Sequence, residues 1–207
     1  MSWNDDYAVV LMSGGVESTA LLNWCVEKGK KPIALHSLWD NPITTANQLH
    51  SNITQICDIL DVDLITHKHP KYDHEERSEE YFHSARHWSV ACLSALTQFP
   101  HIEEYYWGVN SGMINYADDH KHHSDWPWVP RAWEFQMVFE FYARLMNKNH
   151  NYRLYPPLGG QTKLNQWNSI PSEIRTLVNS CSLGYPNQCG KCDKCVEFKH
   201  LTRITGF

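Results

Sequence analysis

With 207 residues, 42% of them hydrophobic and 20% charged, the chain has the size and composition of one globular domain with a small appendage. Its formal net charge of −5 gives no basic excess of the kind that duplex-binding domains show. No apolar run approaches the roughly 18 residues that a membrane span needs, and residues 1–6 lack the basic and apolar regions of a signal peptide. We therefore expect a cytoplasmic protein with no membrane partner.

The chain alternates short apolar runs with stretches of helical periodicity. The apolar runs predict strands over residues 7–12, 32–37, 61–67 and 105–109. The helical spacing of apolar residues predicts helices over residues 16–28, 44–60, 85–99 and 133–147. Strands alternating with helices of this length favour βαβ crossovers, and so an α/β fold whose parallel sheet has helices on both faces. Residues 110–130 and 165–186 show neither pattern, and we expect them to be irregular.

A phosphate-binding loop is predicted directly after the first strand, where the chain reads Met12-Ser13-Gly14-Gly15-Val16-Glu17-Ser18-Thr19. The two glycines can adopt backbone angles that let several N–H groups converge on one anion. The next helix begins at the same place, and its free N–H groups favour negative charge. Three hydroxyl side chains add donors. A tight strand–helix turn without a ligand is the alternative for a glycine pair alone.

The loop carries a family resemblance. Ser-Gly-Gly-x-Asp-Ser after a first strand is the signature of the PP-loop ATP pyrophosphatases, and residues 13–18 resemble it, with Glu17 in place of the usual Asp. The resemblance implies a Rossmann-like fold of the adenine-nucleotide α-hydrolase type with a five-stranded parallel sheet. It also implies that ATP, bound by Met12 to Thr19, activates a carbonyl or carboxylate. Glu17 would then serve Mg²⁺ or the order of the loop.

A second motif lies in the C-terminal region. Four of the seven cysteines are close in sequence: Cys181, Cys189, Cys192 and Cys195. Four thiolates suit a tetrahedral Zn²⁺, and Lys191 and Lys194 would offset the negative charge of such a centre. An iron–sulfur cluster takes the same ligands and stays open as an alternative, whereas thioredoxin-like chemistry needs only one Cys-x-x-Cys. We expect a structural zinc site, because four protein ligands leave no open position for chemistry.

The two motifs together resemble the 7-cyano-7-deazaguanine synthase family of the queuosine pathway. Gly108-Val109-Asn110, Pro157-Leu158 and Thr162-Lys163 also match that family. The resemblance implies a C–N-bond-forming ligase that uses ATP and ammonia to convert 7-carboxy-7-deazaguanine, through the amide, to the nitrile preQ0. Its expected partners are therefore small molecules, with no direct contact to nucleic acid. A homodimer is the assembly that we consider, although nothing in the sequence sets the oligomeric state.

Three residues are candidates for catalysis: Glu17, Arg86 and Lys163. In this chemistry Lys163 is the candidate cation for the departing phosphate or pyrophosphate, and Arg86 is a candidate to face substrate or phosphate. A solvated lysine on a loop and an exposed arginine on a helix are the alternatives. The Asp- and His-rich run at residues 118–125 has the residue types of a metal site, but we expect a solvated loop there.

Two stretches depart from the family pattern. Residues 37–40 read Ser-Leu-Trp-Asp, where the family usually has Tyr-Gly-Gln, and residues 111–130 replace its Asp-Tyr-Ser-Gly-Tyr-Pro-Asp-Cys stretch. The ATP-binding features therefore match better than those for the acceptor. A PP-loop ligase or thiolation enzyme acting on a nucleic acid or protein stays open, as does a zinc-stabilised nucleotide-binding module without turnover.

The two motifs also suggest how the chain is divided. We expect residues 1–165 to form the PP-loop ATP-binding α/β domain. Residues 166–207, which hold the four cysteines, are expected to form a small zinc-binding segment packed on that domain. The chain is too short for a second full domain, so the segment would depend on the first for its core.

Overall fold

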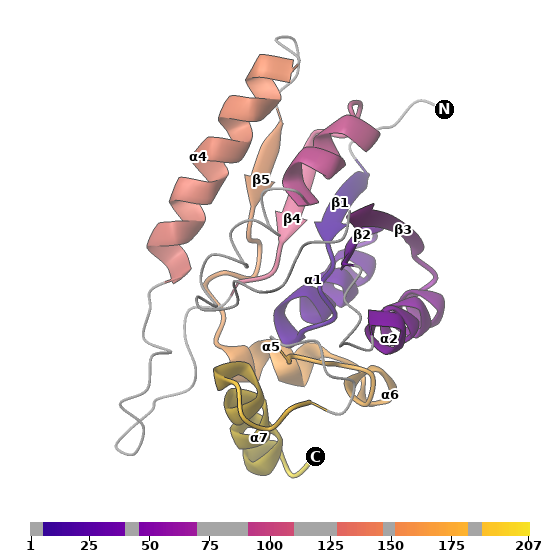
Figure 1. Ribbon diagram of the computed structural model, residues 1–207, viewed down its shortest axis with the longest axis vertical. Helices are drawn as coiled ribbons and strands as arrows, with labels where there is room; N and C mark the ends of the chain where they lie inside the picture. The colour runs from indigo at the N-terminus through magenta and orange to yellow at the C-terminus, as the bar shows by residue number, and fades with distance from the viewer. Residues whose placement is uncertain (1–5, 40–45, 70–90, 110–127, 147–151, 182–187) are drawn as a thin grey trace.

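A sheet of five parallel strands forms the centre of the protein, in the order β3-β2-β1-β4-β5 (Figure 1). The computed structural model describes residues 6–39, 46–69, 91–109, 128–146, 152–181 and 188–207. The strands are β1 (Tyr7–Leu11), β2 (Lys31–Trp39), β3 (Asp63–His69), β4 (Glu104–Trp107) and β5 (Arg153–Tyr155). The first four match predicted strands. The parallel α/β class predicted from sequence is confirmed.

Helices lie on both faces of this sheet. They are α1 (Val16–Glu27), α2 (Ala46–Leu60), the helical residues 91–98, α4 (Trp128–Met146), α5 (Lys163–Ser169), α6 (Ser172–Arg175) and α7 (Asp193–Thr205). Among the described residues, none of these helices has the length and hydropathy that crossing a bilayer requires.

Two sequence expectations about helices were wrong. Residues 165–186 were expected to be irregular, but most of α5 and all of α6 lie there. Each is too short to show a helical period, and each begins at a local signal: Thr162 caps α5 by accepting the N–H of Asn165, and Pro171 precedes α6. In addition, α4 starts at Trp128 instead of residue 133, because Pro130 fits the first turn of a helix. Residues 110–127 lie outside the described part of the chain.

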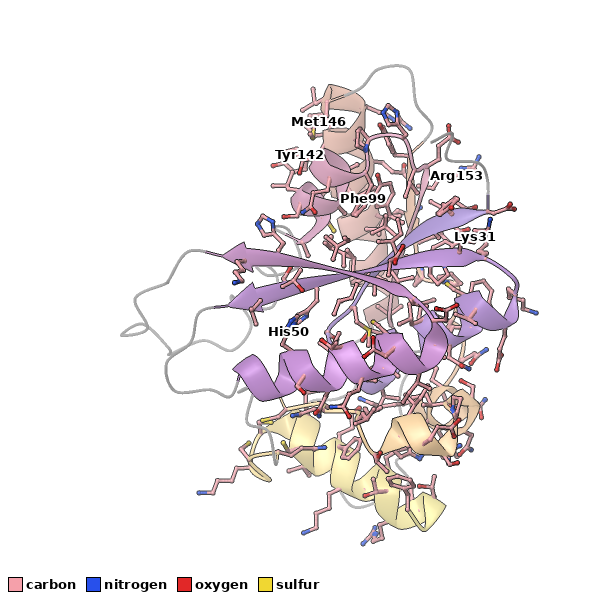
Figure 2. The ribbon with its side chains drawn as sticks, turned by 90° about the vertical axis from the view of Figure 1, so that its right-hand side faces the viewer. Lys31, His50, Phe99, Tyr142, Met146 and Arg153 are labelled. Carbon is pink, nitrogen blue, oxygen red and sulfur yellow. The ribbon has the colours of Figure 1, made fainter. Side chains whose placement is uncertain are left out.

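The two faces of the sheet bury separate hydrophobic clusters. Along β1, Ala8 and Val10 point into the cluster that α1, α2, α5 and α7 cover, and Val9 points into the other, which α4 and residues 91–98 cover. Figure 2 shows this division, with Phe99 and Tyr142 on one side of the strands and His50 on the other. The side-chain alternation of a strand buried on both faces explains the continuous apolar run in the sequence.

A buried histidine joins β2 to the chain that follows β1. His36 is 4% exposed, and its Nδ1 lies 3.0 Å from the carbonyl oxygen of Met12, to which it donates. Its ring stacks on that of His50, with 5.7 Å between the centroids. Burial lowers the pKa of His36 to about 4, with a smaller contribution from His50, although the bond to Met12 acts against this shift. His36 is therefore neutral in the folded protein at neutral pH.

Acidification should destabilise the fold through His36. Its folded pKa of about 4 lies below the ordinary value of 6.5, so between these values the unfolded chain takes up a proton that the folded protein does not. The His36 contribution to the free energy of unfolding should fall by about 2 kcal/mol between pH 7 and pH 5. Urea unfolding of the wild type and His36→Asn at both pH values measures it, with His101→Asn at an exposed site as the control. An equal pH dependence in wild type and His36→Asn would contradict the assignment.

Candidate functional site

The predicted phosphate loop connects the carboxyl end of β1 to the first turn of α1. Gly14 has a φ of 79°, a left-handed conformation that favours glycine. The hydroxyl of Ser18 closes the loop: it accepts the N–H of Ser13 at 3.2 Å, lies 3.1 Å from the Ser13 hydroxyl and donates to the Gly15 carbonyl at 3.3 Å. Among the residues that the structure describes, no side chain caps the N-terminus of α1. The loop thus presents an uncapped helix start and hydroxyl groups, which suit an anion.

The side chains of the loop divide into two groups. Those of Met12 and Val16 lie in the hydrophobic core, so only their backbone atoms can reach a ligand. Buried polar atoms near the loop and near the end of β2 have no hydrogen-bond partner among the described residues: Thr19 Oγ1, His36 Nε2, Ser37 Oγ, His50 Nδ1 and Ser180 Oγ. A Cβ on Gly15 would lie 3.7 Å from the Ser180 hydroxyl, which places that hydroxyl beside the loop. Because buried polar atoms are normally paired, this set suits a polar ligand.

The loop lies where the sheet changes direction. From β1 the chain moves outward through β2 and β3 and then returns to place β4 and β5 on the other side of β1. In open α/β sheets, ligands bind outside the carboxyl ends of the strands at such a switch point. Gly108 follows β4 at this edge, and a Cβ there would lie only 2.5 Å from the carbonyl carbon of Glu17 and 2.6 Å from the nitrogen of Ser18. The close approach of β4 to the loop therefore requires glycine at 108.

A buried lysine completes this edge of the sheet. Lys163, the first residue of α5, is 0% exposed, and its Nζ lies 2.9 Å from Glu17 Oε1 and 2.6 Å from Glu197 Oε2. Lys194 Nζ lies 3.5 Å from the same Glu197 oxygen. Burial would raise the pKa of Glu17, but the charges of Lys163 and Lys194 outweigh it and hold that pKa at about 2. Conversely, burial would lower the pKa of Lys163, but the two glutamates keep it above its ordinary value. Within this Glu17–Lys163–Glu197 cluster, Glu17 and Lys163 are therefore both charged at neutral pH.

The structure brings together two of the three predicted catalytic residues. Glu17 and Lys163 form an ion pair, and the alternative of a solvated Lys163 is wrong because the side chain is fully buried. Arg86 and the run at residues 118–125 lie outside the described residues. Sequence reasoning missed Glu197. Its only signal was its place three residues after Lys194 on a helix, a spacing at which opposite charges meet.

The four cysteines form one cluster at the start of α7. Their Sγ atoms all lie within 4.8 Å of one another. Cys189 and Cys195 are 3.7 Å apart at sulfur, close to the roughly 3.8 Å that a tetrahedron with Zn–S bonds of about 2.3 Å requires. A cluster of several iron atoms would hold the thiolates farther apart than a single ion does. The donor set and its spacing therefore fit one tetrahedral metal ion.

Backbone N–H groups support the sulfur of Cys189. Gly190, with a φ of 69°, turns the chain so that the amides of Lys191 and Cys192 donate to Cys189 Sγ at 3.5 and 3.3 Å. Burial acts to raise the pKa of Cys189, but these amides stabilise its thiolate and the net effect lowers the pKa to about 6. A thiolate at neutral pH is the form that binds a metal ion.

Comparison with known proteins adds information on the fold. No protein-family model and no curated protein sequence matches the chain. Among solved structures, NMN synthetase from Francisella tularensis superposes with a TM-score of 0.54 at 13% identity, covering 98% of this chain and 77% of that one. The chain has an adenine-nucleotide α-hydrolase-like fold. The U34-tRNA thiolase NcsA from Methanococcus maripaludis, solved with its [4Fe-4S] cluster, has a TM-score of 0.47 at 11% identity, covering 99% of this chain and 67% of that one.

Within this adenine-nucleotide α-hydrolase-like fold, Gly108→Ala should destabilise the protein. The added methyl group would overlap the backbone of Glu17 and Ser18, which cannot move as a flexible side chain could. We expect a loss of about 2 kcal/mol in the free energy of unfolding, as for other overpacked sites, measured by urea denaturation. Gly160→Ala is the matched control, since a Cβ there meets nothing within 4 Å. Equal stability of the two variants would contradict the predicted overlap.

The cysteine cluster should bind zinc in a ratio of about one ion per chain. Elemental analysis of protein purified without chelators measures the ratio, and Cys192→Ser should lower it because one ligand of the tetrahedron is lost. Cys57→Ala removes a thiol from the hydrophobic core instead, and should leave the zinc content unchanged. Stoichiometric iron with sulfide, or no metal at all, would contradict the assignment of zinc.

Proposed function

We propose that the protein is an ATP-dependent ligase that converts 7-carboxy-7-deazaguanine and ammonia, through the amide, to 7-cyano-7-deazaguanine. The observation that carries the proposal is the Glu17–Lys163–Glu197 cluster, which links the phosphate loop at the switch point of the sheet to α7, the helix whose first turn holds two of the four clustered cysteines. The sequence resemblance to the 7-cyano-7-deazaguanine synthase family supplies the substrate. The likeness in fold to a synthetase supports nucleotide use in general.

ATP supplies the activation of the acceptor oxygen as a leaving group, first on the carboxylate and then on the amide. The residues of the chain would hold its phosphates through the loop amides and the hydroxyls of Ser13, Ser18 and Thr19. Lys163 would offset charge that develops on the departing phosphate or pyrophosphate, since a fixed cation in a dry site acts strongly. Glu17 would then either meet Mg²⁺ or keep Lys163 and the loop in order.

The acceptor would lie near the carboxyl end of β2. The buried nitrogens His36 Nε2 and His50 Nδ1 and the hydroxyl of Ser37 have no hydrogen-bond partner among the described residues, and they suit the polar edge of a heteroaromatic ring. Adenine and 7-deazaguanine share that chemistry, so this set supports a purine-like ligand of either kind. Ammonia would displace the activated oxygen of the carboxylate, which forms the C–N bond of the amide. Activation and loss of the amide oxygen, with loss of two protons from nitrogen, would leave the nitrile.

Four thiolates would hold Zn²⁺, and in this proposal the ion would supply structure only. With every coordination position taken by a cysteine, no position remains for a water molecule or a substrate. The ligands flank the N-terminus of α7, where Cys192 is the N-cap residue and Cys195 lies in the first turn. Zinc would therefore fix the beginning of the helix that carries Glu197.

A direct assay tests the proposal. Zinc-loaded protein incubated with ATP, Mg²⁺, ammonium and 7-carboxy-7-deazaguanine should yield the amide and then the nitrile by mass spectrometry. Ser18→Ala should lower kcat/KM by about tenfold, because the hydroxyl that closes the loop is lost. Ser172→Ala on the exposed start of α6 is the matched control and should leave the rate unchanged.

The other outcomes of this assay separate the remaining functions. Nucleotide binding without turnover on any acceptor would contradict the ligase and favour a binding module. Product formation only with tRNA, DNA or a protein as the acceptor would favour a PP-loop ligase or thiolation enzyme instead.

A further inference from the structure

Two sites that lie far apart in the sequence are joined by a line of charged side chains. The phosphate loop contributes Glu17, α5 contributes Lys163, and α7 contributes Glu197. The distances are 2.9 Å from Glu17 to Lys163 and 2.6 Å from Lys163 to Glu197. Glu197 follows the metal-ligand candidate Cys195 by two residues on the same helix. One fully buried ammonium group therefore contacts both a residue of the phosphate loop and a residue on the helix that carries Cys195.

The burial of Lys163 makes its position depend on both carboxylates. The side chain is 0% exposed, so water cannot solvate its charge. In the part of the chain that the structure describes, its ion pairs are those with Glu17 and Glu197. Removing one partner of a buried charge is costly, because the remaining charge loses compensation that the interior does not replace. A substitution at Glu197 should therefore alter the ion pair between Lys163 and Glu17, although the two glutamates come from different elements.

The position of Glu197 depends in turn on the first turn of α7. Cys192 is the N-cap residue of this helix, and its carbonyl accepts the N–H groups of Cys195 and Val196. A metal ion that ties Cys192 and Cys195 to Cys181 and Cys189 fixes this turn against the preceding segment. Farther along, α7 is anchored by Phe198 and Leu201 in the core, so loss of the ion should loosen its beginning more than its end.

We propose that Glu197 is a positioning residue that couples the cysteine metal centre to the phosphate loop, so that metal and nucleotide bind cooperatively. With the ion bound, Glu197 holds Lys163 in place beside Glu17. Without it, the first turn of α7 loosens and Lys163 loses one of its two anchors. This inference rests on the proposed function, since it requires a nucleotide in the loop and an ion at the cysteines.

The charge balance separates positioning from a simple electrostatic role. Glu197→Gln keeps the size of the side chain but removes one negative charge near the loop. If Glu197 acted only through its charge, this substitution would strengthen the binding of a polyanion. If Glu197 positions Lys163, the same substitution weakens nucleotide binding, because the lysine is no longer held in place. The two roles predict changes of opposite sign.

The experiment measures the coupling between the two ligands directly. The affinity of a non-hydrolysable ATP analogue with Mg²⁺ is determined by calorimetry for zinc-loaded and chelator-treated wild type. We expect removal of zinc to weaken analogue binding about tenfold, and by linkage the analogue should raise the zinc affinity by the same factor in a chelator competition. In Glu197→Gln, removal of zinc should leave the affinity for the analogue nearly unchanged, and the analogue should leave the zinc affinity nearly unchanged. This variant should still bind zinc in the wild-type ratio.

Two further variants serve as controls for this experiment. Glu173→Gln, on the exposed side of α6, should retain the wild-type coupling. If Glu197→Gln proves unstable, Glu197→Asp is the substitute variant. It keeps the charge on a shorter side chain and should retain part of the coupling. Coupling that persists in Glu197→Gln, or tighter analogue binding by that variant, would overturn the positioning role. If zinc-loaded wild type binds no analogue at all, the proposed function itself fails and this inference falls with it.

Discussion

The buried charge of Lys163 is the constraint on which the arrangement of the site depends. An ammonium group without access to water is tolerated in a protein interior only when its partners are close and well placed. Here the partners come from α1 and α7, while the lysine itself begins α5. The two ion pairs therefore restrict how these three helices can pack against one another. Burial of the hydrophobic cluster beneath the three helices stabilises their packing, and the ion pairs favour the orientation that is observed.

Residues from early and late parts of the sequence pack together on one face of the sheet. Trp167, Ile174 and Leu201, from the region that we expected to form a zinc-binding segment packed on the α/β domain, lie in one hydrophobic cluster with Ala8 and Val10 of β1. The Gly14 carbonyl also accepts the N–H of Asn179 at 2.9 Å, a direct backbone contact between the loop and the chain before the first cysteine. The loop is thus held both by the sheet and by the chain segment that precedes Cys181.

Much of the fold and of the candidate site could be predicted because short stretches of the sequence show patterns that are typical of them. Four strands, the loop and the cysteine cluster each have a signature within about fifteen residues, which is where periodicity and spacing are informative. β5, with three residues, and α5 and α6, with seven and four, are too short to show the periodic pattern that predicts a strand or a helix. The roles of Gly108 and Glu197 could not be predicted for another reason. Each role depends on a contact between segments that are distant in the sequence, Gly108 with the loop and Glu197 with Lys163. A single sequence does not show which distant segments are in contact.

The close contacts of the phosphate loop also bear on how the protein acquires its structure. The loop is synthesised before several of its partners: the Asn23 side chain, on the helix that begins within the loop, donates a hydrogen bond to the carbonyl of Ser169, which lies 146 residues later. Contacts of such long range form late, because the entropy of closing a large loop must be overcome first. A nascent chain can assemble β1, β2 and β3 while Glu17 still lacks its counter-ion. The loop of the candidate site is thus synthesised well before the residues that complete it, so a chain shortened after α4 would hold the loop motif without Lys163 and Glu197.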